Sequence, residues 1–232
     1  MTQPPELRLF GQSAFIFDLD GTLFDSAAQI SSAVNSTRRA LGYAPLSLHV
    51  ARTLIGLPAE ELFGDLELER GALEDAVIAF RIALAKSVRQ GNPLFLGSAD
   101  LLIELRKRGA FIGAATSKPQ ELAELVIAHS ELNGLFDHIQ GTGRLRPKPN
   151  PDTIVACLKR ANLDYGVMVG DRTEDIMAGS RAGLMTVGVA QSSHTPKMLR
   201  AAGAHHVFKS LEDLYLGIDK LPLESAWIRE VF

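Results

Sequence analysis

The chain has 232 residues, of which 46% are hydrophobic and 22% charged, with a formal net charge of −3. These values are ordinary for a globular protein with a sizeable core, and they provide no basic field for nucleic acid. No stretch reaches about 18 consecutive apolar residues, so we expect no membrane span. Cys157 is the only cysteine, and the N-terminus lacks a signal-peptide pattern, which together suit a cytoplasmic protein.

A short apolar run near the N-terminus, residues 14–17, is predicted to form a buried strand because it is aromatic and β-branched. Asp18 and Asp20 follow, and strand alternation points both carboxylates the same way. Two such charges need a cation or a shared proton. Gly21 and Thr22 then begin a loop whose backbone N–H groups could face an anion. Taken alone, Asp-Gly fits an ordinary turn equally well.

The segment 25–93 has a helical pattern. Apolar residues recur at helical spacing in 26–41 and 71–90, and Gly and Pro residues punctuate the stretch between. A plain crossover between strands needs far fewer residues. We therefore expect an inserted all-helical cap at 25–93, with 1–24 and 94–232 forming the core. A second helical domain without a role at the site is the alternative.

Helices and strands alternate from residue 97 onward. The predicted strands are 111–115, 138–140, 167–169, 186–189 and 206–209, and the predicted helices are 99–107, 120–129, 152–161, 174–182 and 196–202, with Ser210 capping a last short helix. This alternation predicts an α/β fold with a doubly wound, mainly parallel sheet. Ligands of such sheets bind at the carboxyl ends of the strands.

Thr116 and Ser117 follow the predicted strand 111–115. Ser117 with Gln120 fits a capping box for the next helix. Thr116 then lies between the carboxyl end of a strand and the amino end of a helix, where free N–H groups and a hydroxyl favour an anion. A helix cap without a ligand is the simpler alternative.

Three further charged residues follow in the second half of the chain. Prolines on both sides of Lys148 hold its backbone extended and present a rigid ammonium group, although a lone loop lysine is often only solvated. Asp171 follows the strand 167–169, and Asp175 falls in the first turn of the next helix, where acidic residues are favourable in any case.

Charge balance links these residues. If ionised, Asp18, Asp20, Asp171 and Asp175 carry four negative charges, and Lys148 offsets one. A cluster of this kind needs more positive charge when it is partly out of water. Oxygen ligands favour a hard cation, for which Mg²⁺ is the obvious candidate. Mg²⁺, a lysine and helix N–H groups together describe a phosphoryl-transfer site.

The four motifs, taken in order, resemble those of the haloacid dehalogenase superfamily of phosphatases. They are Asp18-Leu-Asp-Gly-Thr-Leu, Thr116, Lys148 within Lys-Pro-Asn-Pro, and Gly170-Asp171 with Asp175. The stretch 22–26 and the helical insertion directly after it resemble the phosphoglycolate phosphatase-like branch.

The resemblance implies a role for each catalytic residue. Asp18 would attack phosphorus and become an aspartyl phosphate, and Asp20 would protonate the leaving alcohol and later deprotonate water. Thr116 would hydrogen-bond the phosphoryl group, and Lys148 would steady its charge. The dehalogenase branch lacks an acid at the position of Asp20, so its presence favours phosphate esters over haloacids.

The resemblance also implies the metal ligands and the substrate contacts. Mg²⁺ would be held by the Asp18 carboxylate, the Asp20 backbone carbonyl and Asp171, with Asp175 helping through water or hydrogen bonds. The cap would close over the site and supply substrate-selecting residues. The expected substrate contacts are Gly21, Thr22, Ser117 and, in the cap loop 52–58, Arg52 and Gly56, although an ordinary surface arginine is the alternative for Arg52.

The sequence thus predicts a phosphoric monoester hydrolase that is Mg²⁺-dependent and acts on a small phosphorylated metabolite, with a phosphoglycolate-like ester favoured. A phosphomutase of the β-phosphoglucomutase type shares the Asp pair and the cap. A phospho-accepting regulatory module is a third hypothesis, but receiver domains lack a large cap and an acid two residues beyond the phosphorylated one. Neither nucleic acid nor membrane is expected as a partner, and the oligomeric state is open.

Overall fold

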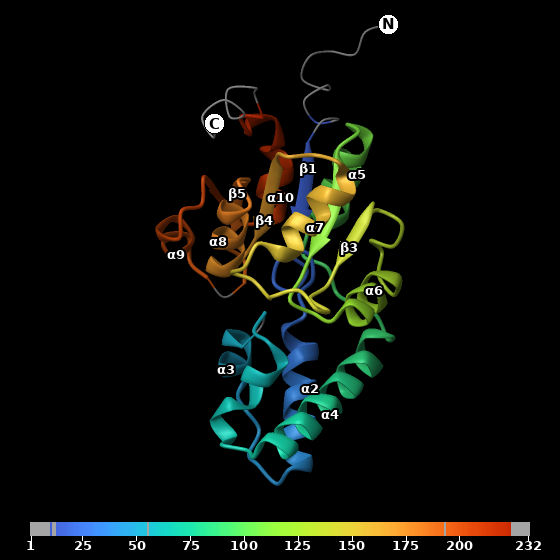
Figure 1. Cartoon of the computed structure of the whole chain (residues 1–232), viewed down its shortest axis with the longest axis vertical. Coiled ribbons are helices and arrows are strands. Elements are labelled where there is room, and N and C mark those ends of the chain that lie inside the picture. Colours follow the sequence, from blue (N-terminus) through green and yellow to red (C-terminus); the bar gives the residue numbers. More distant parts are fainter. Residues whose placement is uncertain (1–9, 11–12, 55, 193, 224–232) are drawn as a thin grey trace, which may run out of the picture.

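The structure is a computed structural model that describes residues 10, 13–54, 56–192 and 194–223; the side chains of 48, 51 and 52 are also outside the description. An α/β core and a helical bundle follow one another along the long axis of the molecule (Figure 1). The chain leaves the core after its first strand and returns before its second, as the sequence predicts.

Within the described residues, the core is a six-stranded sheet in the order β3-β2-β1-β4-β5-β6. Its strands are β1 (Ala14–Phe17), β2 (Phe111–Ala115), β3 (His138–Gln140), β4 (Gly166–Gly170), β5 (Met185–Val189) and β6 (His206–Phe208). Every pairing is parallel, and the strand order reverses direction at β1, so the predicted doubly wound class is confirmed. A reversal of this kind opens a crevice at the carboxyl ends of the strands, where such sheets bind ligands.

Helices cover both faces of the sheet. They are α5 (Ser98–Lys107), α6 (Gln120–Ala128), α7 (Asp152–Ala161), α8 (Thr173–Arg181), α9 (Pro196–Ala201), α10 (Leu211–Leu216) and the 3₁₀ turn η2 (Ile218–Lys220). Successive side chains of β1 alternate between the faces. Ala14 and Ile16 pack in a cluster with residues of α7 and α8, whereas Phe15 and Phe17 pack in the larger cluster with residues of α5 and α10.

The single cysteine belongs to the smaller of these clusters. Cys157 of α7 is fully buried, and its Sγ lies 3.3 Å from the carbonyl oxygen of Ala114 in β2. Burial raises the pKa of the Cys157 thiol to about 12. The side chain is therefore a buried structural thiol.

The inserted segment forms the helical bundle. Its elements are α2 (Ala27–Ala40), α3 (Leu48–Thr53), the 3₁₀ helix η1 (Ala59–Leu66) and α4 (Arg70–Val88). Ile30 and Val34 of α2 and Phe80 and Leu84 of α4 are buried, so the apolar stripes read from the sequence do face the core of the protein. Gly42 follows the end of α2 with φ +82°, the left-handed conformation that glycine adopts at low cost.

The two connections between core and bundle lie side by side. Phe24 pairs antiparallel with Leu94, the N–H of Asp25 donates to Pro93 O at 2.9 Å, and the N–H of Phe95 donates to Leu23 O at 3.0 Å. This paired neck supports the boundaries expected from the sequence, and we propose residues 25–93 as the cap.

One local prediction is wrong. Helix α6 begins at Gln120, its N-cap residue is Pro119, and within the described residues this end of the helix has no side-chain cap hydrogen bond from Ser117. The Gln120 side chain instead binds the segment after β3, donating to Ile139 O at 2.9 Å and accepting from Gly141 N at 2.7 Å. A tertiary contact that is remote in sequence thus displaces the local capping box.

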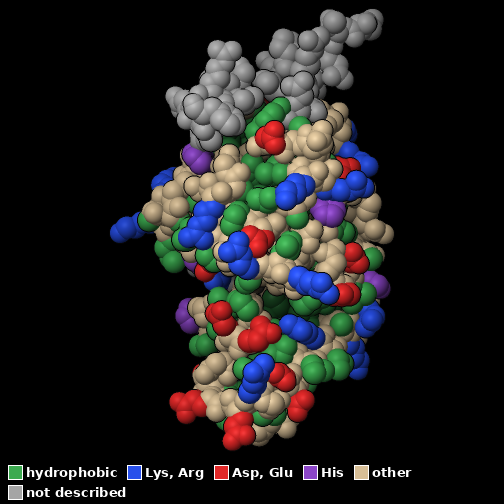
Figure 2. Space-filling view, in the orientation of Figure 1, with side chains coloured by type: hydrophobic (Ala, Val, Ile, Leu, Met, Phe, Trp, Pro, Cys, Tyr) green, Lys and Arg blue, Asp and Glu red, His purple; other side chains and the backbone are tan. Residues whose placement is uncertain are grey.

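The surface view in Figure 2 shows acidic and basic side chains scattered over both the core and the cap. Among the described helices, none is both long enough and apolar enough to span a bilayer.

Candidate active site

The three central strands deliver the predicted residues to one place. β1 ends directly before Asp18, β2 before Thr116 and β4 before Asp171, and these strands are neighbours in the sheet. The N–H of Asp18 donates to Val169 O at 3.0 Å, which continues the pairing of β1 with β4. The site therefore results from strand order, because parallel neighbours end at the same edge.

Lys148 forms the centre of an ion-pair network that includes Asp18. Lys148 Nζ lies 2.6 Å from Asp18 Oδ1, 2.6 Å from Asp175 Oδ1 and 3.0 Å from the carbonyl oxygen of Ala115. These three contacts use all three donor hydrogens of the ammonium group. Lys148 therefore binds the carboxylates of two separate elements and fixes their relative position.

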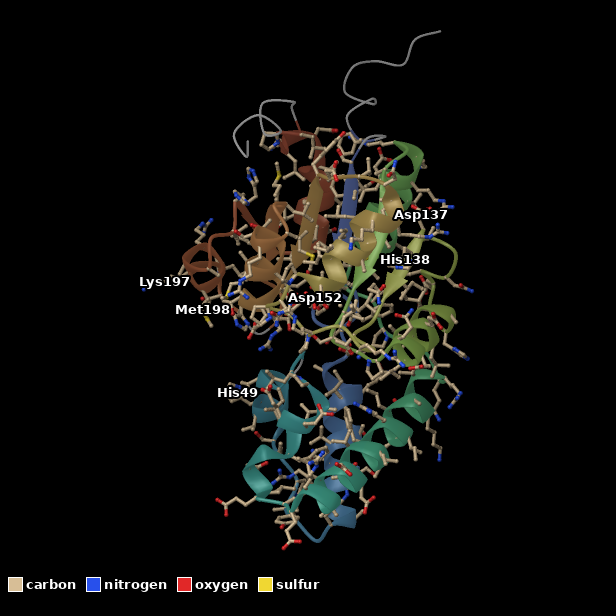
Figure 3. The ribbon with its side chains drawn as sticks, in the orientation of Figure 1. His49, Asp137, His138, Asp152, Lys197 and Met198 are labelled. Atoms are coloured by element: carbon tan, nitrogen blue, oxygen red, sulfur yellow. The ribbon has the colours of Figure 1, made fainter. Side chains whose placement is uncertain are left out.

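The loop that carries Lys148 is itself anchored at its ends. Arg146 makes a bidentate pair with Asp152, Nε to Oδ2 and one terminal nitrogen to Oδ1, both at 2.9 Å. Figure 3 labels Asp152 at the start of α7, at the end of the core that faces the cap. The ion pair between Arg146 and Asp152 joins the two ends of the loop that contains Lys148. This contact therefore adds to the prolines in restricting the backbone of the loop.

Asp171 lies beside Asp18 and is held by the first loop. Thr22 Oγ1 donates to Asp171 Oδ1 at 2.9 Å. The other oxygen, Oδ2, is buried and has no hydrogen-bond partner among the described residues. Gly21, with φ +83°, approaches so closely that a Cβ there would come within 2.5 Å of this oxygen. A buried carboxylate oxygen without a donor is what a bound cation would satisfy.

Asp175 completes the acidic cluster. Its Oδ2 accepts from the N–H of Arg172 at 3.0 Å and so caps α8, while its Oδ1 faces Lys148. Oxygens of Asp18, Asp171 and Asp175 lie within 4.8 Å of one another, and all three residues are buried. Three clustered carboxylates fit a hard divalent cation such as Mg²⁺. The Asp20 carboxylate does not belong to this triad. The expected ligation through the Asp20 backbone carbonyl stays a prediction.

Burial and charge shift the pKa values of this cluster strongly. Burial raises the pKa of Asp18 to about 7; Lys148 opposes the shift, and the charges of Asp175 and Asp20 add to it. Burial, with the charges of Asp175 and Asp18, raises the pKa of Asp171 well above its ordinary value. Burial alone would lower the pKa of Lys148, but Asp175 and Asp18 outweigh it and raise the pKa. Without a cation, the cluster therefore favours bound protons at neutral pH.

Asp20 has a different partner, which sequence reasoning missed. The Lys118 ammonium forms an ion pair with Asp20 Oδ2, and both side chains are less than 10% exposed. Lys118 follows Thr116 by two residues on the loop between β2 and α6, and its N–H donates to Thr116 Oγ1 at 3.3 Å. The only signal in the sequence was that Lys118 follows a predicted strand, because the fact that β2 neighbours β1 comes from the sheet order.

These residues line a pocket between core and cap. The core supplies mainly charged and polar groups: Asp18, Asp20, Thr116, Ser117, Lys118, Lys148, Arg172, Glu174 and Asp175, with Pro119 and Leu122. The cap supplies mainly apolar groups: Ile30, Leu54, Gly56, Leu57, Ala59, Leu62, Phe80 and Leu84, with Arg81 as its one charged lining residue in the described part of the chain.

The predicted substrate contacts divide into three groups. Ser117 and Gly56 line the pocket. Gly21 and Thr22 are not lining residues, and the N–H of Gly21 donates to Phe24 O at 2.9 Å, so their contact with substrate stays a prediction. Arg52 lies in α3, but its side chain is outside the described residues.

Arg172 is a second lining residue that the sequence analysis did not single out. It is buried, it pairs with Glu174 at 3.2 Å, and a Cβ at Gly56 would come within 2.7 Å of its Cδ. A cation is unfavourable at the start of a helix, so an arginine directly before α8 was an available signal.

Buried carboxylates, two lysines and a hydroxyl at the carboxyl ends of parallel strands form a phosphoryl-transfer type of site. The family described as haloacid dehalogenase-like hydrolase matches residues 15–189. The chain belongs to the haloacid dehalogenase-like hydrolases, in their phosphoglycolate phosphatase-like branch, and is an enzyme that hydrolyses phosphoric monoesters.

Individual relatives agree with this assignment. A phosphoglycolate phosphatase of Rhodobacter capsulatus is 32% identical over 212 residues, which cover 88% of this chain and 97% of the relative. A probable phosphatase, IndB, of Dickeya dadantii is 32% identical over 195 residues, covering 81% and 85%. The crystal structure of a predicted phosphatase from Clostridium acetobutylicum superposes with a TM-score of 0.81 at 25% identity, covering 90% of this chain and 99% of that one.

Proposed function

We propose that this phosphatase is Mg²⁺-dependent and hydrolyses a small phosphomonoester through a covalent phosphate on Asp18. The observation that carries the proposal is the position of Asp18. It ends the central strand, its Oδ1 lies 2.6 Å from Lys148, and it faces the pocket together with Asp20. A carboxylate oriented by a lysine and fixed on a strand end is suited to attack phosphorus.

The proposed reaction has two steps. In the first, an Asp18 oxygen bonds to phosphorus, the ester P–O bond breaks, and Asp20 gives its proton to the leaving oxygen. In the second, Asp20 takes a proton from water as the water oxygen bonds to phosphorus, the Asp18–phosphorus bond breaks, and phosphate leaves. Lys148 balances the charge near Asp18 in both steps, and the Thr116 hydroxyl hydrogen-bonds the phosphoryl group.

The metal proposal rests on the orphaned oxygen of Asp171 and on the raised pKa values of Asp18 and Asp171. Asp18 and Asp171 would hold Mg²⁺ directly. Asp175 uses both its oxygens for Lys148 and for the first turn of α8, so it would orient the others. When bound, Mg²⁺ supplies the positive charge that keeps these carboxylates ionised and neutralises phosphoryl oxygens.

We propose phosphoglycolate as the first substrate to test, because the Rhodobacter capsulatus relative carries that name and matches nearly end to end. The partner would thus be a small phosphorylated metabolite. A cytoplasmic location is proposed on the single, buried Cys157.

The test is phosphate release from a panel of esters, with Mg²⁺ and with EDTA. The panel holds phosphoglycolate, pyrophosphate, nucleotides, sugar phosphates and β-glucose 1-phosphate with a trace of the bisphosphate. We expect Mg²⁺-dependent turnover concentrated on one small ester. Isomerisation of the sugar phosphate without phosphate release would instead identify a mutase. A stable phospho-Asp18 without turnover would identify a regulatory module.

A further inference from the structure

The ion pair between Lys118 and Asp20 joins two neighbouring loops at the floor of the pocket. We propose that Lys118 is a positioning residue that holds the Asp20 carboxyl group in the orientation needed for proton transfer to the leaving-group oxygen. This inference rests on the proposed acid–base role of Asp20. It adds a residue that acts through Asp20 and does not itself bond to the reacting atoms.

The pocket contains two lysines with separate partners. Lys148 fills its three donor positions with Asp18, Asp175 and the carbonyl of Ala115. Lys118 Nζ has Asp20 as its only hydrogen-bond partner within the described part of the chain. Each lysine thus serves one of the two aspartates that the mechanism uses, so loss of Lys118 acts on the acid–base group and spares the nucleophile.

The pairing also gives each aspartate its own positive partner. Asp18 and Asp20 are close enough for the charge of Asp20 to raise the pKa of Asp18, since like charges repel. Lys148 pairs with Asp18, and Lys118 pairs with Asp20. Without Lys118, the Asp20 carboxyl group would lose the contact that fixes its rotamer, and misplacement of a catalytic group by about 1 Å can cost roughly 10²-fold in rate.

The backbone of Lys118 is fixed well enough to serve this purpose. Its carbonyl accepts from the N–H of Thr142 at 2.9 Å, and its N–H donates to Thr116 Oγ1 at 3.3 Å. Gly141 packs so tightly against this loop that a Cβ there would lie 2.7 Å from Lys118 O. The lysine therefore extends from an anchored backbone, and its side chain is 9% exposed, which limits competition from water.

The chemistry of the first step provides a specific readout. The need for a proton grows with the basicity of the departing oxygen. An alkoxide must be protonated as the P–O bond breaks, whereas 4-nitrophenolate leaves unaided. A residue that acts through Asp20 should therefore matter for an alkyl ester and hardly at all for 4-nitrophenyl phosphate. A residue that binds the phosphoryl group should matter equally for both.

The experiment measures kcat/KM on benzyl phosphate and on 4-nitrophenyl phosphate, because kcat/KM covers the steps up to phosphorylation of Asp18. For Lys118→Met we expect a loss of roughly 10- to 100-fold on the benzyl ester, below the ~10²–10⁴-fold scale of a removed acid, and less than about threefold on the nitrophenyl ester. Lys118→Arg should restore most of the benzyl activity, since a guanidinium can still pair with Asp20.

A matched control and a double variant separate the outcomes. Arg81→Met removes another pocket-lining cation, which pairs with Glu60 of the cap at 3.4 Å, and should affect both esters by the same factor. In an Asp20→Asn background, Lys118→Met should add no further loss, because residues that act as a unit are not additive. This double variant also removes the buried charge that a lone Lys118→Met leaves unpaired.

Equal loss on both esters for Lys118→Met, with Asp20→Asn still selective for the benzyl ester, would overturn the inference and identify Lys118 as a phosphoryl-binding residue. Equal loss for Asp20→Asn itself would overturn the proposed role of Asp20, and the inference with it. A further loss in the double variant would also contradict the inference.

Discussion

The two halves of the pocket differ in the chemistry of their lining residues. The core half carries acids, lysines and a hydroxyl placed by the ends of three neighbouring strands, and these groups are interlocked by short ion pairs. The cap half is an apolar wall from α2, η1, α4 and the loop before η1, with Arg81 as its charged lining residue in the described chain. The contrast teaches that the positions of the charged groups follow from backbone topology, and we expect the shape of the apolar cap side chains to select the organic part of the substrate.

The largest expected effect tests the core half. Asp18→Asn removes the attacking oxygen, so we expect turnover to fall to background on every ester of the panel. Circular dichroism and thermal melting should show an intact fold, because the amide fills the same space. Near-native activity in this variant would contradict the assignment of Asp18 as the nucleophile. It would also contradict the view that the core half carries the reacting groups.

Asp20→Asn should have the second-largest effect on activity. An amide neither donates the catalytic proton nor accepts one from water, so kcat should drop by about 10²–10⁴. Steady-state kinetics on the best alkyl ester measures this. A change confined to KM would contradict the acid–base role.

Gly21→Ala should weaken the metal site. A Cβ at this position would lie 2.5 Å from Asp171 Oδ2, and φ is +83°, so the substitution displaces a proposed metal ligand. We expect a loss of roughly 10- to 100-fold in Mg²⁺ affinity, the usual scale for a disturbed ligand environment. Activity and calorimetry as a function of Mg²⁺ concentration measure it. Gly134→Ala is the matched control, since φ there is +81° and nothing lies within 4 Å.

Gly56→Ala addresses the cap half. The new Cβ would press on Arg172 Cδ at 2.7 Å, across the contact between cap loop and core. We expect KM to rise by roughly 3- to 10-fold with little change in kcat, because the acids and lysines stay in place. Gly42→Ala, with φ +82° and open space around it, is the control within the cap. If kcat falls as much as KM rises, the cap half also affects the chemical step, and the proposed division between the two halves is wrong.

The last prediction concerns stability and its pH dependence. The pKa of Asp18 is about 7 in the folded protein and near 3.8 unfolded, so the folded state retains a proton that the unfolded state loses as pH rises between these values. Stability of the metal-free protein should therefore fall from about pH 4 to pH 7, by no more than about 1.4 kcal/mol per unit of pKa difference.

Thermal melts in EDTA at acidic and at mildly alkaline pH test this sign. Asp18→Asn, which cannot ionise, should gain stability relative to the native protein at the higher pH, and Mg²⁺ should raise the melting temperature of the native protein most strongly there. A native protein that becomes more stable than the variant with rising pH would contradict the raised pKa of Asp18.

The strands and the acidic residues were predictable because their signals are local. Apolar runs ending in polar residues mark strand ends, and the rule for doubly wound sheets brings those ends together. Asp18, Thr116 and Asp171 were found in this way, whereas Lys148 was found by the prolines that flank it and Asp175 by its place in the first turn of the next helix. The structure gathers all five at one edge.

Contacts that depend on two loops were not predictable from local patterns. The partnership of Lys118 with Asp20 requires knowing that β1 and β2 are neighbours and how the loop after β2 turns. The capping box of Ser117 and Gln120 failed for the same reason, since Gln120 binds Gly141 and Ile139 in a segment that is distant in sequence. Arg172 was not predicted as a lining residue, because its burial depends on contacts with Glu174 and with the cap loop at Gly56.

The paired connections at residues 23–25 and 93–95 have a consequence for how such an enzyme changes over time. The segment between them starts and ends at adjacent points, so its replacement by another segment with equally close ends leaves the strand order and the strand-end chemistry untouched. The neck thus allows the cap to be replaced as a unit. A cap with different apolar lining residues leaves the catalytic residues unchanged, so substrate specificity can diverge while the reaction stays the same.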